Sequence, residues 1–221
     1  MIAVITADLV NSSHYTKDLL SKVLSTLKEE FKEMNLIYGS GLKFKIYRGD
    51  SFQGIVRTPE KSLEISLILK TAINAVRDKE KSRGKAFVKQ ADLKIAIGIG
   101  DYEFERPSIA ESNGQAFQFS GRSLDEIKNE SRTIVLKTPQ ENLNAEFYAS
   151  FLLLDMLMDK WSIASAEVIY HLLKGLKEQE IAEKLHISQS AVNQRKKAAG
   201  WDAVSVLLQR YEQVITKSLE Q

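Results

Sequence analysis

Two aspartates stand where this chain could do chemistry. Asp8 follows the apolar run 2–5, and Asp50 lies in a Gly-Asp turn between the apolar segments 44–47 and 52–56. Both are positions where a strand gives way to a loop or a hairpin. Two carboxylates held side by side at strand ends can bind Mg²⁺ and, through it, a nucleotide phosphate. We therefore expect a metal and nucleotide site if the fold brings the two residues together.

The spacing of apolar residues predicts the elements that must position the two aspartates. Apolar residues at steps of three and four predict helices, and alternating or β-branched runs predict strands. The predicted order is strand 2–5, helix 16–34, a hairpin of 43–47 with 51–57, helix 59–76, strand 93–100, helix 115–128 and strand 133–136. This order is typical of an α/β sandwich with helices on a mixed sheet.

The strand signal ends after Pro139, and residues 143–219 predict only helices separated by short turns. We therefore expect an α+β chain with a domain boundary near 137–143. The predicted domains are a palm-like α/β sandwich over residues 1–138 and an all-α domain over residues 139–221.

Composition limits the class of protein. The chain has 221 residues, of which 43% are hydrophobic and 27% charged, and it has no cysteine. The absence of cysteine excludes a disulfide framework and a thiolate zinc site, and it suits a reducing cytoplasm. The most apolar later stretch, 147–158, contains Asp155 and is shorter than the roughly 18 residues of a membrane span. The first residues lack the basic region of a signal peptide. We expect a soluble, cytoplasmic protein without a membrane partner.

Four segments in the expected order resemble the class III nucleotidyl cyclase catalytic domain, a palm-like fold of the ferredoxin type that is also related to diguanylate cyclases. Residues 7–12 are similar to that family's first metal motif, and residues 48–52 to its second, the Gly-Asp hairpin. Residues 94–100 are similar to a family strand of Arg-Ile-Gly-Ile type. Residues 114–122 resemble the helix start with the family's transition-state Asn and Arg. The resemblance covers the first predicted domain.

The resemblance implies a role for each matching residue. Asp8 and Asp50 would be the ligands of Mg²⁺ or Mn²⁺, which would neutralise a nucleoside triphosphate. Leu9, Val10, Asn11 and Ser12 would contact the phosphates. Gln118 and Arg122 would stabilise the charge of the transition state. Ile46 and Glu111 would contact the base.

Two of these positions depart from the family pattern. Gln118 stands where the family has asparagine, and Ile46 stands where adenylyl cyclases have a purine-selecting lysine. These changes leave open a different nucleotide, or binding without turnover. Other interpretations also stay open, because an aspartate at a strand end is often a turn or cap residue, and Arg122 could equally be a surface arginine.

A second kind of site is predicted far downstream, where residues 177–200 resemble the helix-turn-helix of sigma-like bacterial regulators. The spacing of Ile181, Leu185, Ile187 and Val192 allows two short helices to pack across a tight turn. The turn itself falls on a histidine, a residue type that tolerates positive φ better than β-branched residues do.

The exposed side of the second short helix is expected to contact DNA. Its side chains are of the types that bind base edges and phosphates in a major groove: Ser188, Gln189, Ser190, Asn193, Gln194 and Lys197. The net charge of the chain is only +2, with a pI near 8.6, but residues 160–200 have seven Lys or Arg against four Asp or Glu. Double-stranded DNA is therefore the expected partner. The alternative is a helical module for dimerisation or for packing on the first domain.

The combination of cyclase-like motifs and a helix-turn-helix resembles SatD-type bacterial proteins. We expect a homodimeric, cytosolic DNA-binding regulator whose first domain senses a metal-bound nucleotide. The rival hypothesis is an enzyme, an active class III-type nucleotidyl cyclase that makes a cyclic nucleotide from a nucleoside triphosphate and uses the helical tail for assembly. A third possibility retains the fold without the ligand.

Overall fold

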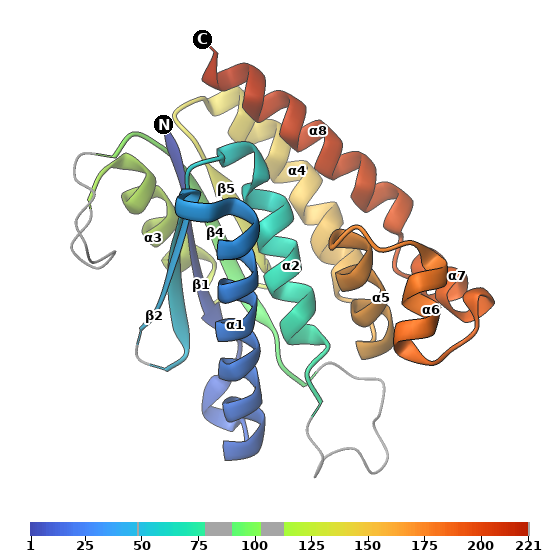
Figure 1. Ribbon diagram of the computed structural model, residues 1–221. Helices are drawn as coiled ribbons and strands as arrows, with labels where there is room; N and C mark the ends of the chain where they lie inside the picture. The colour runs from blue at the N-terminus through green and yellow to red at the C-terminus, as the bar shows by residue number, and fades with distance from the viewer. Residues whose placement is uncertain (48, 78–89, 103–112, 221) are drawn as a thin grey trace.

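A five-stranded sheet forms the centre of the fold and separates two layers of helices (Figure 1). The computed structural model describes residues 1–47, 49–77, 90–102 and 113–220. The strand order is β2-β3-β1-β4-β5, antiparallel throughout except for the parallel β4–β5 pair. The strands are β1 (Ile2–Leu9), β2 (Leu42–Tyr47), β3 (Ser51–Val56), β4 (Leu93–Gly100) and β5 (Ile134–Lys137).

Eight α-helices are present in the described part of the chain. They are α1 (Lys17–Tyr38), α2 (Ser62–Asn74), α3 (Gln115–Ile127), α4 (Glu141–Met158), α5 (Ile163–Leu173), α6 (Glu178–Leu185), α7 (Gln189–Ala198) and α8 (Trp201–Leu219). The predicted α+β class and the predicted order of elements are confirmed. The first strand is longer than predicted, because β1 pairs with β3 on one side and β4 on the other as far as Asp8.

Alternation along β1 divides its side chains between the two layers, as expected for a strand with both faces covered. The residues that pack toward α1 and α2 are Ala3, Ile5, Ala7 and Leu9. The alternate set lies on the α3 face, where Ile2 and Val4 join Ala116 and Phe117 of α3 in a separate cluster. Asp8 belongs to this second set, so its side chain is on the α3 face of the sheet.

Helix α1 covers one face of the sheet with a stripe of apolar residues at helical spacing. The N-terminus of α1 is capped by Thr16, whose Oγ1 accepts a hydrogen bond from the Leu19 N–H at 3.1 Å. Toward the other end, the ring of Phe31 stacks on Phe44 of β2 at 4.4 Å between centroids and meets Phe52 of β3 edge-on at 5.3 Å. These contacts fix α1 against the hairpin that ends in Asp50.

Helices α4, α5 and α8 share the hydrophobic core of the sheet. Tyr211 of α8 is fully buried between Phe147 and Phe151 of α4, and its hydroxyl lies 2.7 Å from Ser62 Oγ at the start of α2. Residues on both sides of the predicted boundary therefore pack in one core, and the division into two domains stays a prediction. None of the described helices is long and apolar enough to cross a membrane.

Candidate functional site

Asp8 and Asp50 lie at the same end of the sheet. The cross-strand neighbour of Asp8 is Ser51 of β3, and Asp50 is in the turn directly before Ser51. The Leu9 N–H donates to the Asp50 carbonyl at 2.9 Å, and Ser12 Oγ donates to Asp50 Oδ2 at 3.2 Å. The end of β1 is thus joined to the hairpin turn, and the fold brings the two aspartates together.

The surroundings of Asp8 oppose its negative charge. Partial burial raises the pKa of Asp8 above its ordinary value of 3.8, and the nearby Asp50 carboxylate raises it further. Lys128 and the Leu9 N–H act in the opposite direction without cancelling the rise. A cation between the two carboxylates would remove their repulsion, so the electrostatics fit a metal site.

The set of possible metal ligands is small. Within residues 1–47, 49–77, 90–102 and 113–220, no group of three or more His, Asp or Glu side chains could hold a metal ion. Mg²⁺ is commonly bound through one or two carboxylates, with waters and substrate phosphates as its other ligands. The pair of Asp8 and Asp50 fits this mode of binding, in which the metal arrives with the nucleotide, better than it fits a permanent protein cage.

The loop after β1 has fewer free amides than the resemblance implies. The Leu9 N–H is engaged by Asp50, and the Val10 N–H donates to the Asp92 carbonyl at 2.9 Å. Asn11 has a left-handed backbone, with φ of 54°, and it precedes a three-residue 3₁₀ turn, Ser12–His14. Long helix α1 begins only after this turn. The amides of Leu9 and Val10 are therefore not open to a phosphate in this conformation.

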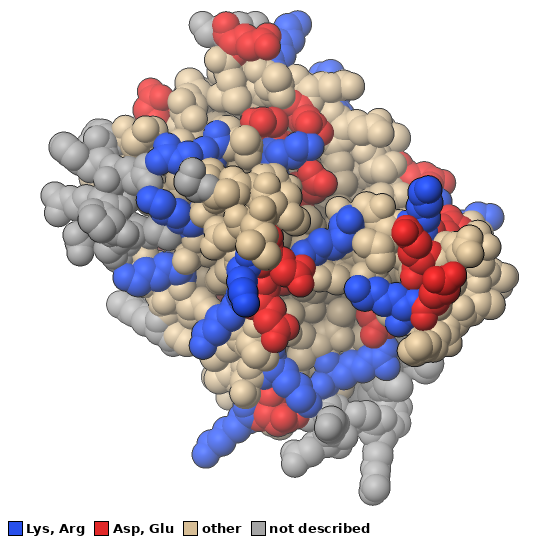
Figure 2. Space-filling view, viewed as in Figure 1, with Lys and Arg blue, Asp and Glu red and all other residues tan. Residues whose placement is uncertain are grey.

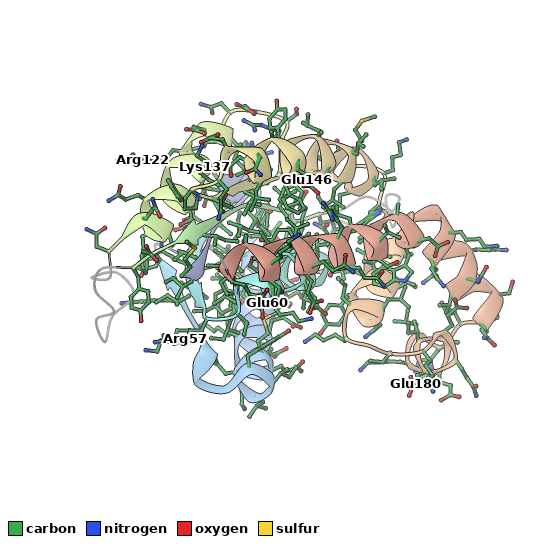
Figure 3. The ribbon with its side chains drawn as sticks, turned by 90° about the horizontal axis from the view of Figure 1, so that it is seen from above. Arg57, Glu60, Arg122, Lys137, Glu146 and Glu180 are labelled. Atoms are coloured by element: carbon green, nitrogen blue, oxygen red, sulfur yellow. The ribbon has the colours of Figure 1, made fainter. Side chains whose placement is uncertain are left out.

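Gln118 and Arg122 lie on the outer side of α3. The inner side of this helix packs on the sheet, where Ser120 Oγ accepts a hydrogen bond from Thr6 Oγ1 at 2.9 Å. Both predicted transition-state residues are exposed and one helical turn apart, and Figure 3 shows Arg122 at the periphery of the molecule. Within one chain, the structure does not bring them to the aspartate pair.

Ile46 lies on the other face of the sheet from the aspartates. Its cross-strand neighbour is Phe52, and both side chains pack in the core with α1. The next residue, Tyr47, is in the cross-strand row of Asp8, because β2 and β1 flank β3 in register there. The second predicted base contact, Glu111, lies outside the described residues.

Lys94, to which the sequence analysis gave no role, is the cross-strand neighbour of Asp8 in β4. Its Nζ donates to the carbonyl oxygens of Ile127, Lys128 and Glu130, at 2.6, 3.0 and 2.5 Å. A lysine in this position satisfies carbonyls that a helix end leaves unpaired. Lys94 therefore fixes the C-terminus of α3 beside the aspartates. Its burial lowers the pKa of Lys94. The sequence feature that could have revealed this role is a single lysine within an otherwise apolar strand.

Two short helices, α6 and α7, joined by a tight turn, occupy the segment for which a helix-turn-helix was predicted. Ile181 and Ala182 of α6 and Val192 of α7 form a buried cluster with Val168 of α5. The turn contains His186 with φ of 53°, the left-handed conformation that the sequence analysis allowed for this residue. Three helices thus pack around one small apolar centre, and this centre fixes the angle between α6 and α7.

The outer face of α7 is polar and open. Asn193 is half-buried, and the other residues predicted to contact DNA are exposed, namely Ser188, Gln189, Ser190, Gln194 and Lys197. The Ser188 hydroxyl caps α7 by accepting from the Ala191 N–H at 3.2 Å. Of the basic residues that follow, Arg195 faces Glu167 at 3.9 Å and Lys196 pairs with Glu178 at 2.9 Å. Figure 2 likewise shows acidic and basic side chains intermixed over this end of the molecule.

Comparisons with known proteins give a distant likeness in structure only. No protein-family model matches the sequence, and no curated protein matches it. The catalytic core of a rhodopsin-guanylyl cyclase with converted specificity, in complex with ATPαS, is 14% identical, with 56% of this chain and 71% of that chain covered and a TM-score of 0.41. A bacterial light-regulated adenylyl cyclase is 8% identical over 61% and 74%, with a TM-score of 0.39. Adenylate cyclases from Trypanosoma brucei in their monomeric state are 10% identical over 61% and 72%, with a TM-score of 0.41.

These values describe a shared arrangement of strands and helices over about 60% of the chain. Scores this low carry no argument about activity.

Proposed function

We propose that this protein is a DNA-binding regulator in which α7 is the recognition helix. The observation that carries the proposal is the packing of α5, α6 and α7 around Val168, Ile181 and Val192, with the polar face of α7 left open to solvent. A helix in a major groove needs such a face, since base edges are bound by amide and hydroxyl side chains.

The residues of α7 divide into two roles in this proposal. Gln189, Asn193 and Gln194 have amides that can form paired hydrogen bonds with adenine. Lys197 has no ion pair to another described residue, so its charge is available to a phosphate, which positions the helix without specifying sequence. Arg195 and Lys196 already face carboxylates, and they contribute less to phosphate binding for that reason.

Fluorescence anisotropy with a duplex selected from a random pool tests this proposal. Gln189→Ala should weaken binding by about 1–3 kcal/mol and relax the preference for one base pair. Lys197→Ala should weaken binding to all sequences alike and reduce the salt slope by about one. Gln209→Ala and Lys217→Ala, at exposed positions of α8, are the matched controls. The proposal fails if no duplex is selected, or if the α7 and α8 variants behave alike.

For the sheet we propose a regulatory site at which Asp8 and Asp50 bind Mg²⁺ or Mn²⁺ together with a nucleoside triphosphate. Support comes from the junction between β1 and the hairpin turn and from the raised pKa of Asp8 next to Asp50. A bound divalent ion would neutralise the phosphates. The chain itself would orient Asp50 through Ser12 Oγ, and it would hold α3 beside Asp8 through Lys94.

Titration calorimetry with Mn²⁺ and each common nucleoside triphosphate tests this site. Asp8→Ala and Asp50→Ala should abolish binding of the metal-nucleotide pair, because each variant leaves a single carboxylate. Asp125→Ala changes an exposed aspartate on α3 and should leave binding intact. The site is excluded if no nucleoside triphosphate gives a heat of binding and none shows metal-dependent competition.

The second candidate function is nucleotidyl cyclisation between two chains. It is favoured by the exposure of Gln118 and Arg122 on one outer face of α3, where they could serve the aspartates of another chain but not their own. Arginine in such a place would stabilise the charge that develops on the phosphates. Incubation with Mn²⁺ and triphosphates should then yield a cyclic product that is lost in both Asp50→Ala and Arg122→Ala. Intact triphosphate after incubation excludes this candidate while leaving the regulatory site unaffected.

A further inference from the structure

Helix α4 is apolar on a face that the fold leaves open. A helix that is hydrophobic all round is normally buried on every side, yet α4 lies beside α8 (Figure 1) and along one edge of the molecule when it is seen from above (Figure 3). Large apolar side chains are exposed on this part of the surface: Leu153 at 65% and Met156 at 61% on α4, and Val206 at 64% on α8. Contiguous apolar surface of this kind marks an interaction site.

A groove of about 600 Å³ runs between the two helices at this place. Its walls come from Leu153 and Leu157 of α4 and from Ala203, Val206 and Leu207 of α8, with few polar atoms among them. Glu146 of α4 points toward α8 (Figure 3), where its carboxylate accepts from Arg210 Nε at 2.8 Å. This ion pair bounds one end of the groove.

The charges on α8 are arranged symmetrically about Val206. Asp202 lies four residues before Val206, and Arg210 lies four residues after it, so all three share one face of the helix. The groove includes both charged residues. Asp202 has no ion pair within the described part of the chain, while Arg210 is 57% exposed and uses only Nε on Glu146. Each end of this face is therefore open to a charge of the opposite sign.

We propose that the α4–α8 groove is the interface with a second copy of this chain. If two α8 helices cross in antiparallel fashion at Val206, each Asp202 faces the Arg210 of the partner subunit, and both charge pairs form at once. The two Val206 side chains then meet at the crossing point, beside the two apolar grooves. Such an interface is isologous, since the same surface serves both chains. A partner of different sequence would have no reason to match this spacing, and the proposal does not depend on DNA or nucleotide binding.

Sedimentation velocity of the full chain over micromolar concentrations tests the proposal. The wild-type chain should be dimeric. Asp202→Arg and Arg210→Asp should each weaken dimerisation about tenfold or more, because both charge pairs become repulsive. Val206→Glu should also give monomers. Leu36→Glu, at an exposed apolar position on α1, should leave the dimer intact.

The decisive experiment mixes equal amounts of the two charge variants, Asp202→Arg and Arg210→Asp. A chain with Asp202→Arg and a chain with Arg210→Asp have complementary surfaces, so the mixture should form a heterodimer although each variant alone is monomeric. Circular dichroism melts verify that both variants are folded. A monomeric wild-type chain would overturn the proposal, and so would a mixture that fails to associate or charge variants that dimerise as well as the wild type.

Discussion

Gly98→Ala should displace α3 from the sheet, because the glycine allows this helix to approach β4 closely. A Cβ at Gly98 would lie 2.3 Å from the Ala116 carbonyl oxygen and 2.5 Å from the Ser120 nitrogen, where ordinary contact begins at 3.4 Å. Both atoms belong to the backbone, so relief requires a movement of the whole helix by about 1 Å. Overpacking of this kind costs about 1–3 kcal/mol.

A second loss adds to this cost. The same displacement should break the hydrogen bond from Thr6 Oγ1 to Ser120 Oγ, now 2.9 Å long, at a cost of about 1 kcal/mol. The expected total is therefore about 2–4 kcal/mol of unfolding free energy. Equilibrium urea denaturation, followed by circular dichroism, measures it directly.

The control is Gly121→Ala in the same helix. A Cβ at Gly121 meets nothing within 4 Å, and alanine in a helix interior is favoured over glycine by about 0.5–1 kcal/mol. This variant should therefore stabilise the protein. The reasoning is refuted if Gly98→Ala costs less than about 0.5 kcal/mol, or if the two variants change stability in the same direction.

Three further predictions concern charged and polar groups. The raised pKa of Asp8 disfavours its ionised form in the folded state, so wild-type stability should fall as the pH rises above 3.8 toward the folded-state pKa. Asp8→Asn should therefore melt at a higher temperature than the wild type at pH 7 without metal, and the gain should vanish at acid pH; a gain that persists there would contradict the prediction. Lys70→Met leaves the partly buried Asp92 without the ammonium that now lies 2.6 Å away, and should cost about 3 kcal/mol; a cost below about 1 kcal/mol in urea would show that the pair is not stabilising. Tyr211→Phe removes the hydroxyl 2.7 Å from Ser62 Oγ and should cost about 1 kcal/mol, with Tyr102→Phe, at an exposed position, as the neutral control.

The pairing of β1 with β3, which brings Asp8 to Asp50, joins segments on either side of α1, and only the family resemblance implied it. The hairpin that holds Asp50 could be predicted from local patterns, because a short hairpin fixes the register of its own strands. The order of helices and strands followed from periodicity for the same reason. The pair of short helices α6 and α7 could also be predicted, since Ile181 and Val192 are close in sequence and pack across a single turn.

The face of the sheet on which Ile46 lies could have been predicted from the sequence, but the family resemblance assigned Ile46 to the base instead. Leu42, Phe44 and Ile46 alternate with two lysines and Tyr47, and this alternation places Ile46 on the core side of β2.

Other features of the site had no local signal. The Val10 N–H is engaged by Asp92, which lies far along the chain and is held by Lys70. Whether Gln118 and Arg122 meet the aspartates depends on how α3 is rotated on the sheet, and Gly98 and Ser120 decide that rotation through close packing. Contacts of this range follow from tertiary packing and not from sequence spacing.

The most direct test of DNA recognition by α7 uses the absence of cysteine from the chain. A Ser190→Cys variant is labelled with an iron chelate that cleaves nearby DNA, and Ser21→Cys on α1 is labelled in the same way as the control. We predict cuts confined to a few adjacent base pairs of the selected duplex from position 190, and none above background from position 21. Equal cleavage from both positions, or no localised cleavage from position 190, would contradict the assignment of α7 as the helix that contacts DNA.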